Sequence, residues 1–117
     1  MDISALEALL QRGVDNALLR FTLGTHYLKA NEPATAITHL ERSLQWSPEY
    51  SAAWKLLGKA HALHDDTDAA QRTWTEGMAV AERNGDHQAY KEMQVFVGRL
   101  QRAARGPAVA AIPATRS

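Results

Sequence analysis

The sequence predicts an all-α fold in which antiparallel helix pairs stack side by side, and three observations support it. Residues 17–50 and 51–84 align without gaps at an offset of 34 residues. Within each stretch, apolar residues recur every three to four positions, which is the period of an α-helix. A glycine also interrupts both stretches at the same place, as Gly24 and Gly58. A repeated unit of this length indicates a repeat architecture rather than a single closed core.

Residues 1–14 predict a short N-terminal helix. Ser4 and Glu7 have the spacing of a capping box, in which each side chain bonds a free amide of the first turn. An apolar stripe follows, formed by Leu6, Leu9 and Leu10. We expect this helix either to cover the end of the first helix pair or to lie in the groove of the stack.

Each 34-residue stretch predicts one helix pair. Polar turns at residues 31–33 and 65–68 separate the two helices of a pair. Ser47, Pro48 and Glu49 predict a helix start between the pairs, with a capping hydroxyl and a first-turn proline. The apolar stripes are Leu19, Leu23, Tyr27, Ile37, Leu40 and Leu44 in the first pair, and Trp54, Leu57, His61, Trp74, Met78 and Ala81 in the second.

The two glycines are explained by close packing within each pair. A glycine inside a helix costs about 1 kcal/mol relative to alanine, which is tolerable where a neighbouring helix must come close. We expect each glycine to face an alanine of the partner helix, with a large residue further along: Gly24 with Ala36 and Leu40, and Gly58 with Ala70 and Trp74.

The C-terminal part predicts one further helix, over residues 86–104. Gly85 ends the preceding helix and Asp86 caps the new one. Its apolar stripe is Tyr90, Met93, Val97 and Leu100. Two prolines among small residues favour a disordered tail at 105–117. We therefore expect about five antiparallel helices, comprising an N-terminal helix, two helix pairs and a C-terminal capping helix.

Together these residues resemble the tetratricopeptide repeat (TPR) family, an α-solenoid of helix pairs. The resemblance covers residues 17–84, identifies 15–104 as a TPR domain with repeats 17–50 and 51–84, and departs from the family pattern at Arg20, His61 and Glu82. It implies a protein–protein interaction or scaffold module. The matching positions are Leu23, Gly24, Tyr27, Ala36, Leu40, Ser43 and Pro48 in the first repeat, and Trp54, Leu57, Gly58, Ala70, Trp74 and Gly77 in the second.

Composition argues against several other classes. Thirteen basic residues balance thirteen acidic ones, so no global charge favours nucleic acid or a membrane surface, although the C-terminal residues 99–117 are positive. The absence of cysteine excludes disulfides and thiolate metal sites. The N-terminus lacks the features of a secretory signal, so we expect a cytoplasmic protein.

No pattern of catalytic residues is present, so we expect no enzymatic activity and no cofactor. His61 and His64 could approach a metal ion, but His61 occupies a repeat position that is structural and the following aspartates suit a helix cap. We therefore expect no metal site.

The resemblance implies a concave groove lined by the first helix of each pair. The residues expected to bind a partner there are Phe21, Thr25, Lys29, Lys55, Leu56 and Lys59. Lys55 and Lys59 share one helix face and suit a peptide with an acidic group beside an apolar anchor, although they could equally serve only solubility.

Two further readings concern the same surfaces. The carboxylate clamp of TPR co-chaperones needs lysine, asparagine and arginine where this chain has Phe21, Thr25 and Leu56, followed by either Asp86 and Tyr90 or Gln88 and Glu92. We therefore expect no clamp.

As an alternative, a homodimer could form through apolar seams on the terminal helices, either Leu6, Leu9 and Leu10 or Tyr90, Met93, Phe96 and Val97.

Overall fold

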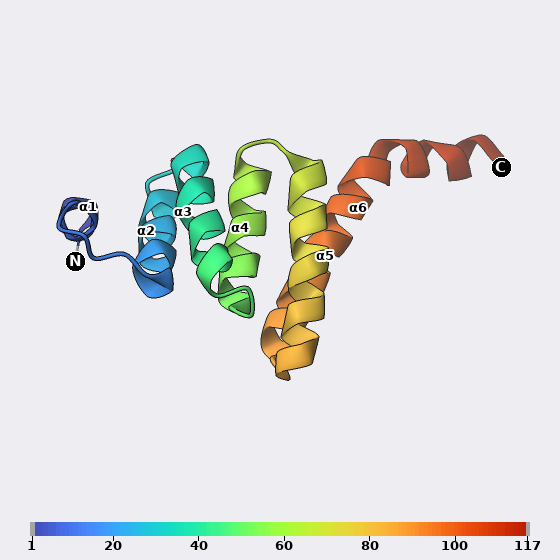
Figure 1. Cartoon of the computed structure of the whole chain (residues 1–117). Helices are drawn as coiled ribbons and strands as arrows, with labels where there is room; N and C mark the ends of the chain where they lie inside the picture. Colours follow the sequence, from blue (N-terminus) through green and yellow to red (C-terminus); the bar gives the residue numbers. More distant parts are fainter. Residues whose placement is uncertain (1, 117) are drawn as a thin grey trace.

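The computed structural model describes residues 2–116, with side chains to residue 105. These residues form six α-helices that follow one another in a row (Figure 1). The expected all-α stack is confirmed, but the count of about five was one short, because the elements named for it already add up to six. The helices are α1 (Ile3–Gln11), α2 (Ala17–Lys29), α3 (Pro33–Trp46), α4 (Ser51–Leu63), α5 (Thr67–Asn84) and α6 (His87–Arg116).

The turns within the two pairs have the same geometry. Asn31 and Asp65, which are equivalent in the two repeats, adopt left-handed backbone conformations with φ of 59° and 60°. These short polar residues tolerate that conformation better than most side chains. Asp66 then caps α5 by accepting a hydrogen bond from the Ala69 amide at 3.1 Å. The repeat in sequence is therefore a repeat in backbone conformation.

Two predicted helix starts were wrong. The cap of α1 is Asp2, which accepts from the Ala5 amide at 2.9 Å, so Ser4 lies inside the helix and forms no capping box. Ser47 ends α3 rather than starting α4. The residue before a proline is disfavoured in helical conformation, so Pro48 stops α3 at this point, and α4 begins only at Ser51.

The glycines make room for large side chains, not for alanines as expected. A Cβ atom at Gly24 would lie 2.5 Å from Leu40 Cγ, and one at Gly58 would overlap the Trp74 indole ring. The indole N–H of Trp74 donates to the Lys55 carbonyl of α4 at 2.9 Å. Because each glycine has no side chain, a large residue of the partner helix can pack directly against the backbone there.

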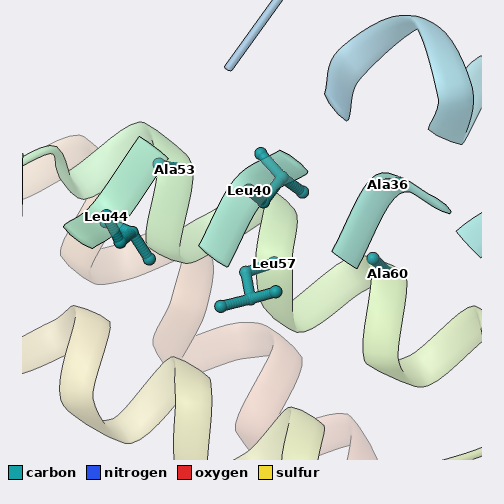
Figure 2. Packing of buried hydrophobic residues seen from close by; sticks show 6 residues of the cluster. All are labelled: Ala36, Leu40, Leu44, Ala53, Leu57 and Ala60. Atoms are coloured by element: carbon teal, nitrogen blue, oxygen red, sulfur yellow. The ribbon is translucent and has the colours of Figure 1, made fainter. Parts of the chain in front are cut away.

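The core runs along the stack between successive helices. Figure 2 shows the part between α3 and α4, where leucines of both helices interdigitate with alanines. Its members are Ala36, Leu40, Leu44, Ala53, Leu57 and Ala60. A second cluster joins α5 and α6, where Met93 packs against Gly77 and is fully buried.

Helix α1 covers the end of the stack and does not enter the groove. It contacts only α2 among the described helices, and Figure 1 shows it at the end of the row, outside α2. Leu6 packs there with Leu19 and Leu23, and the Tyr27 hydroxyl donates to Glu7 Oε2 at 3.0 Å. The question left open by the sequence is settled in favour of an end cap.

Helix α6 is longer than predicted. It begins one residue after the Asp86 cap and its backbone is helical to Arg116, where the sequence favoured an end near residue 104. Alanines recur through residues 103–114 and favour a helix, whereas Gly106, Pro107 and Pro113 in the same stretch disfavour one. Disorder of residues 105–117 stays a prediction. None of the described helices is both long and apolar enough to cross a membrane.

Candidate functional site

Helices α2, α4 and α6 lie next to one another, because α4 contacts both of the others. All six residues predicted to bind a partner lie on α2 and α4. The structure divides them into residues at the α2–α4 boundary, residues that face α6, and Lys29, which is exposed at the end of α2.

Two of the predicted residues, Phe21 and Leu56, pack where α2 meets α4, and Thr25 lies one turn after Phe21 on α2. Phe21 and Leu56 are half-buried against the core cluster between α3 and α4. The Phe21 ring lies 4.7 Å, centroid to centroid, from the ring of Tyr50. The Thr25 hydroxyl donates to the Phe21 carbonyl at 3.0 Å within its own helix. These residues offer an apolar rim, but their main contacts are internal.

The two lysines of α4 both reach toward α6. Lys55 Nζ lies 3.0 Å from Glu92 Oε1, with side chains that are 23% and 38% exposed. Lys59 Nζ lies 5.1 Å from the centroid of the Phe96 ring, which in turn contacts Trp74. The sequence suggested two free cations, whereas Lys55 is already paired. Lys59 is the exposed cation of this pair of lysines.

A small hollow of about 180 Å³ lies between α4 and α6 beside Lys55. It was not predicted as a site, because its walls come largely from α6, which lies outside the two repeats. Asp86 accepts hydrogen bonds there from the Ser51 hydroxyl at 2.7 Å and from the Ala89 amide at 3.1 Å, and these bonds lower the pKa of Asp86. The lining residues are Ala52, Lys55, Asp86, Gln88, Ala89 and Glu92.

The register of α6 is now fixed. Gln88 and Glu92 line the hollow and face α4, whereas Tyr90 packs against the buried cluster around Trp74. The sequence left two registers open for a carboxylate clamp, and the structure has the one that places Gln88 and Glu92 toward α4. Glu92 is a carboxylate at a position where the clamp needs a cation. The sequence signal for this register is Asp86, because an N-cap sets where the helix begins.

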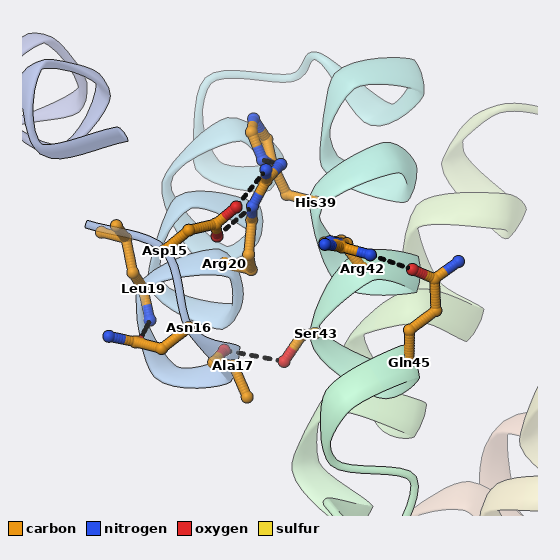
Figure 3. Close-up of polar contacts among 9 residues, drawn as sticks. All are labelled: Asp15, Asn16, Ala17, Leu19, Arg20, His39, Arg42, Ser43 and Gln45. Atoms are coloured by element: carbon orange, nitrogen blue, oxygen red, sulfur yellow. Dashed lines mark hydrogen bonds and ion pairs between the residues drawn. The ribbon is translucent and has the colours of Figure 1, made fainter. Parts of the chain in front are cut away.

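A second group of polar side chains lies at the other end of the stack (Figure 3). Arg20, which stands where the second repeat has Trp54, forms two 2.8 Å bonds with Asp15 and lies 3.1 Å from His39 Nδ1. The His39 ring also stacks on Tyr27 at 5.4 Å. Burial lowers the pKa of His39 and so favours the neutral form of the ring. This group anchors the linker between α1 and α2 and replaces the packing of a tryptophan.

The two histidines considered as metal ligands lie at the end of α4, where His61 is in the last turn. His64 is the C-cap residue of α4, and Asp66 is engaged as the cap of α5. Within the part of the chain whose side chains are described, no three histidine, aspartate or glutamate side chains gather as metal ligands would.

Comparison with known proteins gives consistent results. The family model described as Tetratricopeptide repeat matches residues 27–93. The TPR repeat-containing protein PA0015 of Pseudomonas aeruginosa is 50% identical over 103 residues, covering 88% of this chain and 98% of that protein.

Solved structures also match. Protein BPP2914 from Bordetella parapertussis has a TM-score of 0.80 and 44% identity, over 88% of this chain and 90% of that one. A tetratricopeptide repeat domain protein from Salinibacter ruber, solved by NMR, has a TM-score of 0.67 and 26% identity, over 74% of this chain and 87% of that one.

Proposed function

The chain belongs to the tetratricopeptide repeat family, and we propose that it is a non-catalytic module that binds a peptide segment of a partner protein on the face formed by α2, α4 and α6. Helical repeats present extended concave surfaces suited to such binding. The observation that carries the proposal is the exposed Lys59 ammonium beside the Phe96 ring. A cation next to an apolar ring favours a peptide with an acidic group close to an apolar side chain.

The six predicted residues take different roles in this proposal. Lys59 receives the acidic group, and Lys55 contributes only when the peptide competes with Glu92. Phe21 and Leu56 supply apolar area at the α2–α4 boundary, with Thr25 beside them, and Lys29 extends the positive rim. The Asp86 and Glu92 carboxylates of the hollow disfavour an acidic chain terminus, so a carboxylate clamp is not part of the proposal.

Self-association through the terminal helices has less support. In the N-terminal seam, Leu6 is buried against α2, and in the C-terminal seam, Met93 is buried against α5. Side chains already packed within one chain cannot form the core of a dimer interface without unfolding. Sedimentation at several micromolar concentrations tests this alternative, and a dimer whose population rises with concentration would support it. A cytoplasmic location likewise stays part of the proposal.

The experiment compares partners captured by the wild-type chain with those captured by two single variants. Lys59→Glu reverses the exposed charge and is expected to lose the partner. Lys91→Glu makes the same charge change at an exposed position of α6 that is not one of the proposed binding residues. This variant is expected to retain the partner. Lys55→Glu is avoided because it would place two carboxylates together at Glu92. Equal capture by all three proteins would refute binding at this face.

A further inference from the structure

His39 is a buried titratable side chain that the proposed peptide-binding face does not use. This residue of α3 is only 7% exposed. Arg20 Nη1 lies 3.1 Å from His39 Nδ1 (Figure 3). A guanidinium group donates hydrogen bonds and cannot accept them, so Nδ1 must be the acceptor and carries no proton. The geometry therefore requires the neutral imidazole ring, with its proton on Nε2.

Two polar side-chain connections join the N-terminal segment to the stack, and each involves a residue that touches this ring. In the linker between α1 and α2, Asp15 accepts two hydrogen bonds from Arg20, each of 2.8 Å. In α1, Glu7 accepts from the hydroxyl group of Tyr27, whose ring stacks on His39. A change of charge on His39 therefore acts on both connections.

Protonation of His39 is incompatible with this arrangement. A proton on Nδ1 would replace the hydrogen bond from Arg20 by a contact between two cations. Neither the Asp15 nor the Glu7 carboxylate bonds the ring, and to reach it either one would have to shift from its present partner. Burial outweighs the attraction of these carboxylates and lowers the pKa of His39. The groups that face the ring are Glu7 of α1, Asp15 of the linker, and Arg20 and Tyr27 of α2, while Arg42 on α3 itself lies over the Trp46 ring.

Helix α1 is the element that can respond to this change. It has nine residues and contacts only α2 among the described helices. An isolated helix below about 12–15 residues is marginal in water, so α1 depends on its attachment. Its buried residue, Leu6, packs against Leu19 and Leu23. Helices α3–α6, in contrast, share the larger core clusters.

We propose that His39 is a pH-sensitive switch for the attachment of α1. The neutral ring holds Arg20 in place for Asp15, whereas the charged ring releases the linker and α1 while α2–α6 stay folded. Once Asp15 has left, Arg20 turns into solvent and no longer opposes the charge on the ring. Release uncovers Leu6, Leu19 and Leu23, an apolar surface that the attached helix hides.

The direction of the pH dependence follows from the two states. The attached state favours the neutral ring, so the free energy of attachment is fully present above the ordinary histidine pKa of about 6.5 and decreases below it. The switch does not depend on the proposed peptide-binding function, because it lies at the other end of the stack from Lys59.

The test measures amide hydrogen exchange of the full-length chain by NMR at about pH 7.5 and about pH 5, between the ordinary pKa values of carboxyl and amino groups. Protection factors, taken relative to the intrinsic rate at each pH, report the opening of each helix. Protection in α1 is expected to fall by up to about 30-fold, because each pH unit below about 6.5 contributes up to tenfold. If His39 became charged only on global unfolding, protection would fall in α5 and stay constant in α1.

Two variants assign the effect to the ring. His39→Gln cannot titrate, but its amide oxygen still accepts from Arg20, so protection in α1 is expected to lose most of its pH dependence. His64→Gln is a matched change at the exposed C-cap of α4 and is expected to keep the dependence. The imidazole ¹⁵N spectrum of the wild-type chain gives an independent measurement, and at about pH 7.5 it is expected to show His39 protonated on Nε2.

Three results would overturn the proposal. The first is equal protection of α1 at the two pH values in the wild-type chain. The second is the same pH dependence in His39→Gln as in the wild-type chain. The third is a proton on Nδ1 of His39 at about pH 7.5, because Arg20 would then have no acceptor in the ring.

Discussion

Replacing Gly58 by alanine is the sharpest perturbation of the packing described above. On helix propensity alone, alanine stabilises a helix by about 1 kcal/mol relative to glycine. At Gly58, however, the added methyl group would overlap the Trp74 indole ring, which is rigid and almost fully buried. The ring must move, and its hydrogen bond to the Lys55 carbonyl is weakened or broken.

The magnitude follows from the opposing terms. Overpacking a well-filled core costs roughly 1–3 kcal/mol, and loss of a buried hydrogen bond costs about 1 kcal/mol more. After subtracting the propensity gain of about 1 kcal/mol, we expect Gly58→Ala to lower the free energy of unfolding by roughly 1–3 kcal/mol. At about 4 °C per kcal/mol for a chain of this size, Tm falls by roughly 4–12 °C.

The chain contains a matched control. Gly98 also lies inside a helix, but a Cβ atom there would meet only the end of the flexible Arg102 side chain, at 3.3 Å. Gly98→Ala is therefore expected to raise Tm by up to about 4 °C, as propensity alone predicts. Thermal unfolding followed by circular dichroism measures both variants. If Gly58→Ala unfolds at or above the wild-type temperature, the packing argument is wrong.

Three further predictions concern the ends and turns of the stack. Tyr27→Phe removes the hydrogen bond to Glu7 and should increase amide hydrogen exchange in α1 while leaving exchange in α5 unchanged. The same exchange rates in α1 of the variant and the wild-type chain would contradict this prediction. Asp66→Ala removes the cap of α5 and should cost about 1 kcal/mol in urea unfolding. Because burial lowers the pKa of His39 below that of the unfolded chain, stability should fall as the pH drops below about 6.5. His39→Gln should reduce this dependence, and an unchanged slope would refute the assignment.

The repeat made the fold predictable from sequence. Residues that recur at an offset of 34, such as Gly24 and Gly58, identified the helix pairs and the family. The identity of their packing partners could not be derived in the same way, because a one-dimensional pattern does not say how far along a helix a contact falls. Alanines were expected opposite the glycines, whereas Leu40 and Trp74 lie there.

The candidate site was less predictable for a related reason. Lys55 and Lys59 were found from their spacing, but their partners Glu92 and Phe96 belong to α6, which has no counterpart in the repeat. The register of that helix depends on a single cap, Asp86. A shift of two residues would have placed Tyr90, not Glu92, opposite the lysines.

Positions at which the two repeats differ carry the individual chemistry of this chain. Positions alike in both repeats lie mainly in the core, where packing limits the choice of side chain. On the first helix of each pair, in contrast, Phe21 aligns with Lys55 and Thr25 with Lys59. Two copies of one backbone thus present an apolar half and a cationic half. Because a stack of identical repeats would offer the same contact twice, this divergence favours, within the proposed function, a peptide of mixed character, with its apolar part near α2 and its acidic part at Lys59 of α4.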